Sequence, residues 1–211
     1  MTALGNTVLL GDSITVGYAP SLVTTGWKRK IAEVSKTSDW LLTQARAAPQ
    51  TFNGATDVVL LIGTNDIGYV PTATTAKNIA MIVGLAKAGG ARVFVMTLPP
   101  FKGWQNYASN YAAIEGRRQA LNAAIRAAGY NVIPLDTLLA SPGDPQTILP
   151  AADSGDHLHP RGGYLATTVA KAAAAHQEDV KPPSQPATSS NWWLAIPIVG
   201  AIYGAYRVLR R

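Results

Sequence analysis

The sequence predicts an α/β domain built on a parallel sheet. Short apolar runs rich in valine, leucine and isoleucine recur along the chain and are typical of buried strands. A longer segment with helix start or stop signals follows most of these runs, so strands and helices alternate. Such alternation implies right-handed crossovers between parallel strands. A length of 211 residues is enough for one such domain with its own core.

The first half of the chain supplies three predicted strands. Residues 6–10 and 58–62 are apolar runs that each end at a glycine, and residues 30–34 form a shorter strand between them. A helix is expected over residues 37–47, because threonine, serine and aspartate open it. A second helix over residues 74–88 is closed by two glycines.

The second half repeats this alternation. Residues 92–98 and 131–135 are the fourth and fifth predicted strands. A long helix over residues 111–128 ends at a glycine, and a last helix over residues 162–175 packs back on the sheet. The strand and helix pattern therefore continues to about residue 176, which sets the predicted domain at residues 1–176.

Composition excludes several classes of protein. The chain has no cysteine, so it forms no disulfide, and its three histidines lack the spacing of metal ligands. The net charge of +6 is modest, and three of the arginines lie at the C-terminus. The basic run Lys28-Arg29-Lys30 is interpreted as a solvated approach to the second strand. We therefore predict neither a nucleic-acid partner nor a metal or other cofactor.

Polar motifs follow two buried strands and precede the last helix. Ser13 comes directly after the first strand, and Asn65 follows the strand at residues 58–62. Asp156 and His159 lie three residues apart, just before the last helix. Ligands of open parallel sheets bind at the carboxyl ends of the strands, so these side chains are expected to converge there. A serine activated by an imidazole, which a carboxylate orients, is the arrangement of a serine hydrolase.

The three motifs also carry a family resemblance. Gly11-Asp12-Ser13-Ile14-Thr15, Gly63-Thr64-Asn65-Asp66 and Asp156-x-x-His159-Pro160 occur in this order. Together they resemble the SGNH/GDSL hydrolase family of esterases and lipases, over roughly residues 5–176. The combination is specific, although each motif alone is common in turns.

The resemblance implies a three-layer α/β/α sheet of the flavodoxin-like type and a serine esterase that needs no metal. It implies that Ser13 is the nucleophile, that His159 is the base and that Asp156 orients His159. The side-chain amide of Asn65 and the backbone N–H of Ser13 would form the oxyanion hole.

One position departs from the family pattern. The family has a glycine N–H as a further oxyanion donor on the loop after the second strand, and this loop contains no glycine here. By its spacing to Asn65, Lys36 occupies the position of that glycine. Its backbone N–H is expected to serve as the donor if the backbone keeps its shape. A positive φ would strain a lysine, which puts full catalytic competence in question.

Two loops are predicted to contribute to substrate binding. Ile67 begins a segment beside Asn65, and Trp104 and Tyr107 lie on the loop after the fourth strand. These side chains are expected to line an acyl or sugar pocket, and the alternative is that the aromatic rings only cover the core. His157, next to Asp156, is interpreted as a solvated or capping side chain.

The C-terminal part of the chain differs in composition from the domain. Residues 177–190 are rich in proline and serine, which is typical of a linker, and residues 191–211 are apolar with aromatic ends. We predict that this last segment is a helical membrane anchor. Gly200 and Gly204 would allow two such helices to associate. The alternatives are docking into a partner protein and packing on its own domain.

The sequence therefore predicts a serine ester hydrolase tethered through its C-terminus to a membrane or an assembly. No signal peptide is recognised at the N-terminus, and the membrane of a virion is one predicted location. The predicted substrates are small acyl esters, lipids and O-acetylated glycans. The alternative is an inactive binding or structural protein on the same fold, since a fold does not guarantee an activity.

Overall fold

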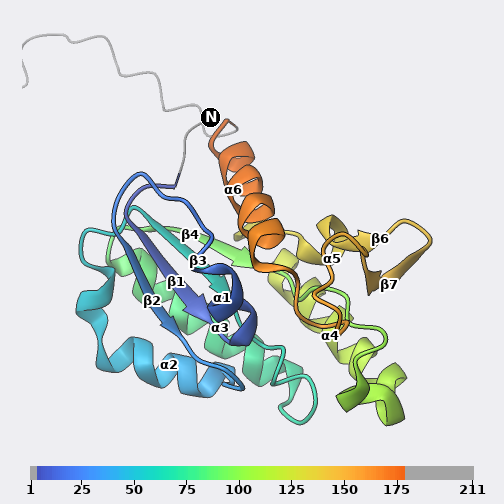
Figure 1. Ribbon diagram of the computed structural model, residues 1–211. Coiled ribbons are helices and arrows are strands. Elements are labelled where there is room, and N and C mark those ends of the chain that lie inside the picture. The colour runs from blue at the N-terminus through green and yellow to red at the C-terminus, as the bar shows by residue number, and fades with distance from the viewer. Residues whose placement is uncertain (1–3, 179–211) are drawn as a thin grey trace, which may run out of the picture. The chain divides into compact units, whose positions relative to one another are not determined.

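The computed structural model describes residues 4–178. Five parallel strands form one sheet in the order β2-β1-β3-β4-β5 (Figure 1). The strands are β1 (Thr7–Gly11), β2 (Lys28–Ala32), β3 (Asp57–Leu61), β4 (Arg92–Met96) and β5 (Asn131–Ile133). This is the flavodoxin-like order, in which the direction of winding reverses between β1 and β3. The predicted parallel α/β sheet is confirmed.

Helices cover both faces of the sheet. The longer ones are α2 (Ser38–Ala47), α3 (Thr72–Ala88), α4 (Tyr111–Ala127) and α6 (Gly162–Glu178). Two short ones are α1 (Ser13–Tyr18) and α5 (Leu135–Leu138). Buried side chains of α2, α3 and α4 share one hydrophobic cluster, and those of α1, α5 and α6 share the other. Figure 1 shows α1 and α6 on one side of the strands and α2 and α3 on the other.

The strands divide their side chains between the two clusters. In β1, Val8 and Leu10 belong to the cluster of α2, α3 and α4, whereas Leu9 belongs to the opposite cluster. The strands β3 and β4 alternate in the same way. Side chains of successive strand residues point to opposite faces, so a sheet covered twice must be apolar at every position. This requirement explains the unbroken apolar runs in the sequence.

The second strand differs from its prediction. It begins at Lys28 rather than at residue 30, so the basic run is part of the strand and not an approach to it. The side chains of Lys28, Arg29 and Lys30 are exposed, and β2 pairs only with β1 at the edge of the sheet. Charged side chains are compatible with an edge strand, where they also prevent pairing with another chain.

Several short elements were not predicted. They are α1, α5, two 3₁₀ helices, η1 (Pro49–Phe52) and η2 (Gln105–Asn110), and an antiparallel hairpin of β6 (Ala140–Ser141) and β7 (Asp144–Ile148). Strand β7 is as long as β1, but its sequence DPQTI contains no apolar run. The other elements are too short for a periodic apolar pattern to be recognised in the sequence.

The last helix is longer than predicted. Helix α6 continues to Glu178 and so includes the first two residues of the predicted 177–190 linker. The rest of that linker and the predicted anchor at residues 191–211 lie outside the described residues. Within residues 4–178, no helix is both long and apolar enough to span a bilayer.

Candidate active site

The turn that carries Ser13 depends on close backbone packing. A Cβ atom at Gly11 would lie 2.2 Å from the carbonyl oxygen of Leu61 in β3, a distance that excludes any side chain. Asp12 precedes α1 as its N-cap, and its Oδ1 accepts a hydrogen bond of 3.1 Å from the backbone N–H of Ile14. Ser13 begins α1 at the carboxyl end of β1, next to β3.

His159 reaches Ser13 from a closed loop before α6. The ends of this loop are joined by a hydrogen bond of 2.6 Å from the Arg161 N–H to the Ala152 carbonyl and by a bridge between Asp153 and Pro160. The distance between Nε2 of His159 and Oγ of Ser13 is 2.9 Å, across 146 residues of sequence. This distance permits direct proton transfer between the hydroxyl and the imidazole.

Asp156 holds the other nitrogen of the same ring. Its Oδ2 lies 2.5 Å from Nδ1 of His159, and its Oδ1 accepts from the backbone N–H groups of His159 and Leu158 at 2.8 and 3.0 Å. Burial alone would raise the pKa of this carboxyl, but the hydrogen bonds from His159 and Leu158 outweigh burial and lower the pKa to about 2. Ser13, His159 and Asp156 thus form one continuous hydrogen-bonded chain.

Asn65 lies at the end of the turn after β3. Gly63 has a φ of 121°, and a Cβ there would approach Leu121 to 2.8 Å, so this turn requires glycine. The side-chain amide of Asn65 donates a hydrogen bond of 3.0 Å to the carbonyl of Lys36. The structure therefore brings together the two loops in which oxyanion donors were predicted.

The predicted strain at Lys36 falls on its neighbour. Ser35 has a φ of 62°, whereas Lys36 is not among the residues with positive φ. The side chain of Lys36 forms an ion pair of 3.0 Å with Glu33 and lies 5.6 Å from the centre of the Trp40 ring. A lysine is thus accommodated at position 36 without left-handed backbone.

A buried carboxylate connects the same two loops. Asp66 accepts hydrogen bonds from the backbone N–H of Ser38 at 3.0 Å and from its hydroxyl at 2.5 Å, and a third from Thr75 at 3.1 Å. Asn78 in turn donates to the Ser38 hydroxyl at 3.0 Å. Burial raises the pKa of Asp66. Asp66 therefore caps α2 from another loop, which fixes the Lys36 segment beside Asn65.

A second buried carboxyl belongs to Asp12, the residue before Ser13. Burial raises the pKa of Asp12 to about 7, against the lowering effect of the hydrogen bond from Ile14. In the described part of the chain, Oδ2 of Asp12 and the hydroxyl of Tyr18 are buried, and the Thr64 hydroxyl lies close enough to Asp12 to oppose the rise of its pKa. Burial of the carboxyl among so few polar groups favours its protonated form.

The predicted substrate residues lie in different surroundings. Ile67 is 3 % exposed and belongs to the hydrophobic core. Tyr107 packs edge-on against Phe101 and Trp104, and its hydroxyl donates to the carbonyl of Thr64 at 3.4 Å. Trp104 lines a cavity of about 360 Å³, which Asp156 also lines. Contacts of these three residues with a substrate stay a prediction.

A second aspartate–histidine pair, which was not predicted from the sequence, lies on the same loop. Nδ1 of His157 lies 2.7 Å from Oδ2 of Asp153, and the two residues are separated by four positions. His157 also has a left-handed backbone, with a φ of 64°. The signal in the sequence is an aspartate four residues before a histidine, but His157 also adjoins Asp156, which makes Asp156 the more obvious partner.

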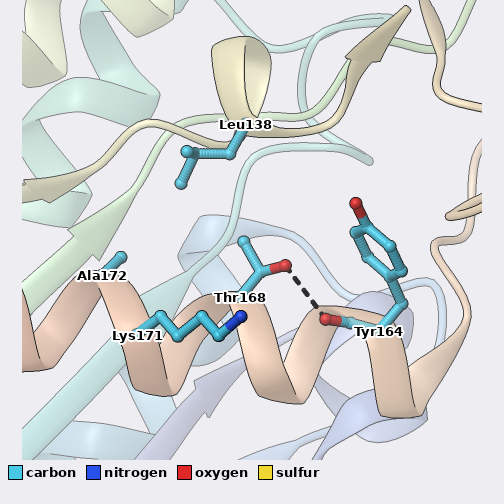
Figure 2. A pocket seen from close by; sticks show the side chains of 5 residues that line it. All are labelled: Leu138, Tyr164, Thr168, Lys171 and Ala172. Carbon is cyan, nitrogen blue, oxygen red and sulfur yellow. Dashed lines mark hydrogen bonds between the residues drawn. The ribbon is translucent and has the colours of Figure 1, made fainter.

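A further hollow lies between α5 and α6. Its volume is about 380 Å³, and Figure 2 shows Leu138 on one side and side chains of α6 on the other. Thr168 donates a hydrogen bond of 3.0 Å to the carbonyl of Tyr164 at its edge. None of the predicted site residues lines it. Within residues 4–178, no cluster of three or more histidine, aspartate or glutamate side chains has the arrangement of a metal site.

Residues 9–162 match the GDSL-like lipase/acylhydrolase family, which is well over half of the chain. The protein belongs to this family. No curated protein sequence is significantly similar to it.

Similar solved structures have the same fold. A GDSL-like lipase from Bacteroides thetaiotaomicron superimposes with a TM-score of 0.64 at 20 % identity, over 82 % of this chain and 88 % of its own. A putative acylhydrolase from Bacteroides fragilis gives 0.64 at 22 % identity, over 82 % and 86 %. A lipase/acylhydrolase from Enterococcus faecalis gives 0.61 at 18 % identity, over 86 % and 99 %. At these identities the likeness concerns the fold.

Proposed function

We propose that the protein is a serine ester hydrolase in which Ser13 is the nucleophile, His159 the general base and Asp156 the residue that orients His159. The observation that carries this proposal is the continuous hydrogen-bonded chain from the Ser13 hydroxyl through both ring nitrogens of His159 to Asp156. A serine hydroxyl becomes a useful nucleophile only with such a base in contact.

The reaction has two steps. Oγ of Ser13 forms a bond to the ester carbonyl carbon while its proton passes to Nε2 of His159. The bond to the alcohol oxygen then breaks, and His159 returns the proton to that oxygen. Water next attacks the acyl-serine with help from His159, which releases the carboxylic acid and restores the Ser13 hydroxyl. Asp156, with a pKa of about 2, stays ionised and stabilises the imidazolium in both steps.

The oxyanion of each tetrahedral intermediate needs hydrogen-bond donors. We assign this role to the backbone N–H of Ser13, the backbone N–H of Lys36 and the side-chain amide of Asn65. Two features support the assignment. Ser13 is the first residue of α1, whose first N–H groups have no acceptor within the helix, and Asn65 contacts the Lys36 backbone directly. Donors of this kind typically contribute about 100- to 1000-fold to turnover.

Hydrolysis of p-nitrophenyl acetate tests the proposal. The wild-type protein should release p-nitrophenol well above the rate without protein, and Ser13→Ala and His159→Ala should reduce kcat by at least about 1000-fold. A fluorophosphonate probe should label the wild type stoichiometrically and Ser13→Ala not at all. Equal rates in all three proteins, together with no labelling, would instead support the inactive binding protein.

Attachment to a membrane is a separate proposal, which rests on the sequence of residues 191–211 alone. The full-length chain should sediment with phosphatidylcholine vesicles through this segment. Replacing both Trp192 and Trp193 by serine should reduce the bound fraction, because these residues would anchor the segment at the interface. Equal binding by both proteins would contradict this assignment.

A further inference from the structure

We propose that Asp153 and His157 are positioning residues of the catalytic loop, in which Asp153 fixes the backbone around Asp156 and the imidazole of His157 holds Asp153. This inference rests on the proposed esterase activity, because it concerns how Asp156 is kept in place against His159. It gives a role in turnover to a carboxylate and an imidazole that take no part in the chemical steps.

The carboxylate of Asp153 binds the chain on both sides of Asp156. Its Oδ1 accepts hydrogen bonds from the backbone N–H groups of Gly155 and His157, at 2.8 and 3.1 Å. Gly155 and His157 are the two neighbours of Asp156 in the sequence. Asp153 therefore restricts the backbone from which the carboxylate of Asp156 reaches His159.

This short stretch of backbone needs such support. Gly155 and His157 have φ values of 110° and 64°, so a residue with positive φ lies on each side of Asp156. Glycine adopts positive φ without steric conflict, but this conformation is unfavourable for a residue with a Cβ atom. The conformation around Asp156 is therefore maintained by hydrogen bonds to Asp153 and not by the intrinsic preference of the chain.

The imidazole of His157 binds the second oxygen of the same carboxylate. Nδ1 of His157 lies 2.7 Å from Oδ2 of Asp153, and Asp153 is only 9 % exposed. A carboxylate with so little access to water depends on partners within the protein. The ring also lies against Gly103 in the loop after β4, where a Cβ atom would be 3.2 Å from it. Both oxygens of Asp153 are thus held, and the ring that holds one of them is itself packed.

Other contacts close the base of this loop. The backbone N–H of Arg161 donates to the carbonyl of Ala152 at 2.6 Å, and the backbone N–H of Ser154 donates to the carbonyl of His159 at 3.1 Å. Neither contact uses the side chains of the positioning pair. Loss of the pair should therefore leave the loop in place and disturb the turn at residues 155–157, which predicts a loss of turnover rather than a loss of the fold.

Substitutions of Asp153 test this role with p-nitrophenyl acetate as the substrate. Asp153→Ala should lower kcat about 100-fold and leave KM within about threefold, because only the orientation of the triad is disturbed. Asp153→Asn keeps an oxygen for the two backbone N–H groups and should lower kcat by no more than about tenfold. The matched control Asp144→Ala removes a carboxylate that accepts from the backbone N–H of Gln146 at 3.1 Å in β7, and kcat should stay within about twofold.

Three substitutions at residue 157 separate the imidazole from the unusual backbone. His157→Asn places an amide N–H near the position of Nδ1 and tolerates positive φ, so it should keep at least about a third of the wild-type kcat. His157→Gln carries its amide one carbon further out, and His157→Gly favours the backbone but has no donor. Both should lower kcat about tenfold, the effect of one hydrogen bond. A wild-type kcat in His157→Gly would contradict a positioning role for the imidazole.

A double-mutant cycle distinguishes action through Asp156 from general support of the loop. Asp153→Ala added to Asp156→Asn should lower kcat by less than a further factor of about three, because the residue that it positions is already defective. Equal losses in both backgrounds, or a kcat of Asp153→Ala within about threefold of the wild type, would overturn the inference. If Asp153→Ala does not fold, the three variants at residue 157 decide the question. Undiminished hydrolysis by Ser13→Ala would instead overturn the esterase proposal on which the inference rests.

Discussion

The serine side and the histidine side of the candidate site are built in different ways. Ser13 and Asn65 lie after the ends of the central strands β1 and β3. The loop of Asn65 is held by contacts with distant parts of the chain, such as the hydrogen bond between Asp66 and Ser38, which are 28 residues apart. On the histidine side, Asp156 bonds to groups only two or three residues away. The serine side therefore depends on contacts between distant parts of the chain, whereas the loop on the histidine side is held by hydrogen bonds between residues close in sequence.

This loop contains two aspartate–histidine pairs, Asp153–His157 and Asp156–His159, of which only the second contacts Ser13. In both pairs a carboxylate holds Nδ1 of the ring and accepts hydrogen bonds from nearby backbone N–H groups. Only His159 touches Ser13, because the loop meets the carboxyl end of β1 at that residue. Local sequence can thus make an oriented imidazole twice, but a contact across the fold selects the one that can act as the base.

The largest expected effect is a loss of activity when Asp156 is replaced, compared with replacement of Asp153. Asp156→Asn should lower kcat for p-nitrophenyl acetate by about 10,000-fold, because the amide would favour the wrong tautomer of His159. Asp153→Asn should lower it by no more than about tenfold, since His157 does not contact Ser13. Steady-state kinetics on both variants measures the difference. Similar losses would mean that the two pairs act as one unit.

On the serine side, Asn65→Ala should lower kcat by about 100- to 1000-fold through loss of an oxyanion donor. The matched variant Asn78→Ala removes another amide, which bonds to Ser38 in the support behind the loop. It should lower the free energy of unfolding, with a much smaller effect on kcat. Equal effects of both variants on kcat would contradict a direct role for Asn65.

The pKa values of Asp12 and Asp156 are shifted in opposite directions, so the two carboxyl groups should affect stability differently as the pH changes. Asp12 has a pKa of about 7 in the fold, above its ordinary value of 3.8. Between these values the unfolded chain binds fewer protons, so this group lowers the free energy of unfolding as the pH rises. Asp12→Asn removes the effect, and its stability relative to wild type should increase by about 2–3 kcal/mol from pH 5 to pH 7.

Asp156 is the control for that measurement. Its pKa of about 2 lies below the ordinary value of 3.8, so its contribution is complete above pH 4 and is lost only as the pH falls toward 2. The stability difference between Asp156→Asn and wild type should therefore be the same at pH 5 and pH 7. Urea unfolding at the two pH values checks both variants, and parallel behaviour of the two would refute the assignment for Asp12.

The smallest expected effect concerns the loop after β2, which contains Ser35 and Lys36. Ser35→Gly should raise the free energy of unfolding by about 0.5–1 kcal/mol, because glycine adopts the left-handed backbone without strain. Lys36→Gly should lower it by a similar amount, because glycine adds only disorder to the unfolded chain, and should leave kcat within about threefold. If only Lys36→Gly raised the free energy of unfolding, residue 36 rather than residue 35 would be the strained position.

Much of the fold was predictable because its signals are local. The central strands β1, β3 and β4 each contain an unbroken apolar run, and the turns at Gly11 and Gly63 exclude side chains. The start of β2 was misplaced because an edge strand can be as charged as a loop, which Lys28, Arg29 and Lys30 show. The short α5 has too few residues for a recognisable period, and β6 and β7 contain no apolar run.

The sequence by itself determined the parallel α/β sheet and proposed Ser13, Asn65, Asp156 and His159 as one group, since the spacing of motifs to strand ends is a local property. Only the tertiary structure decided the 2.9 Å contact of His159 with Ser13, that Ser35 rather than Lys36 carries the positive φ, and that Asp153 and His157 form a second pair. Those facts depend on which loops meet at the edge of the sheet, and contacts between distant residues leave no periodic pattern in the chain.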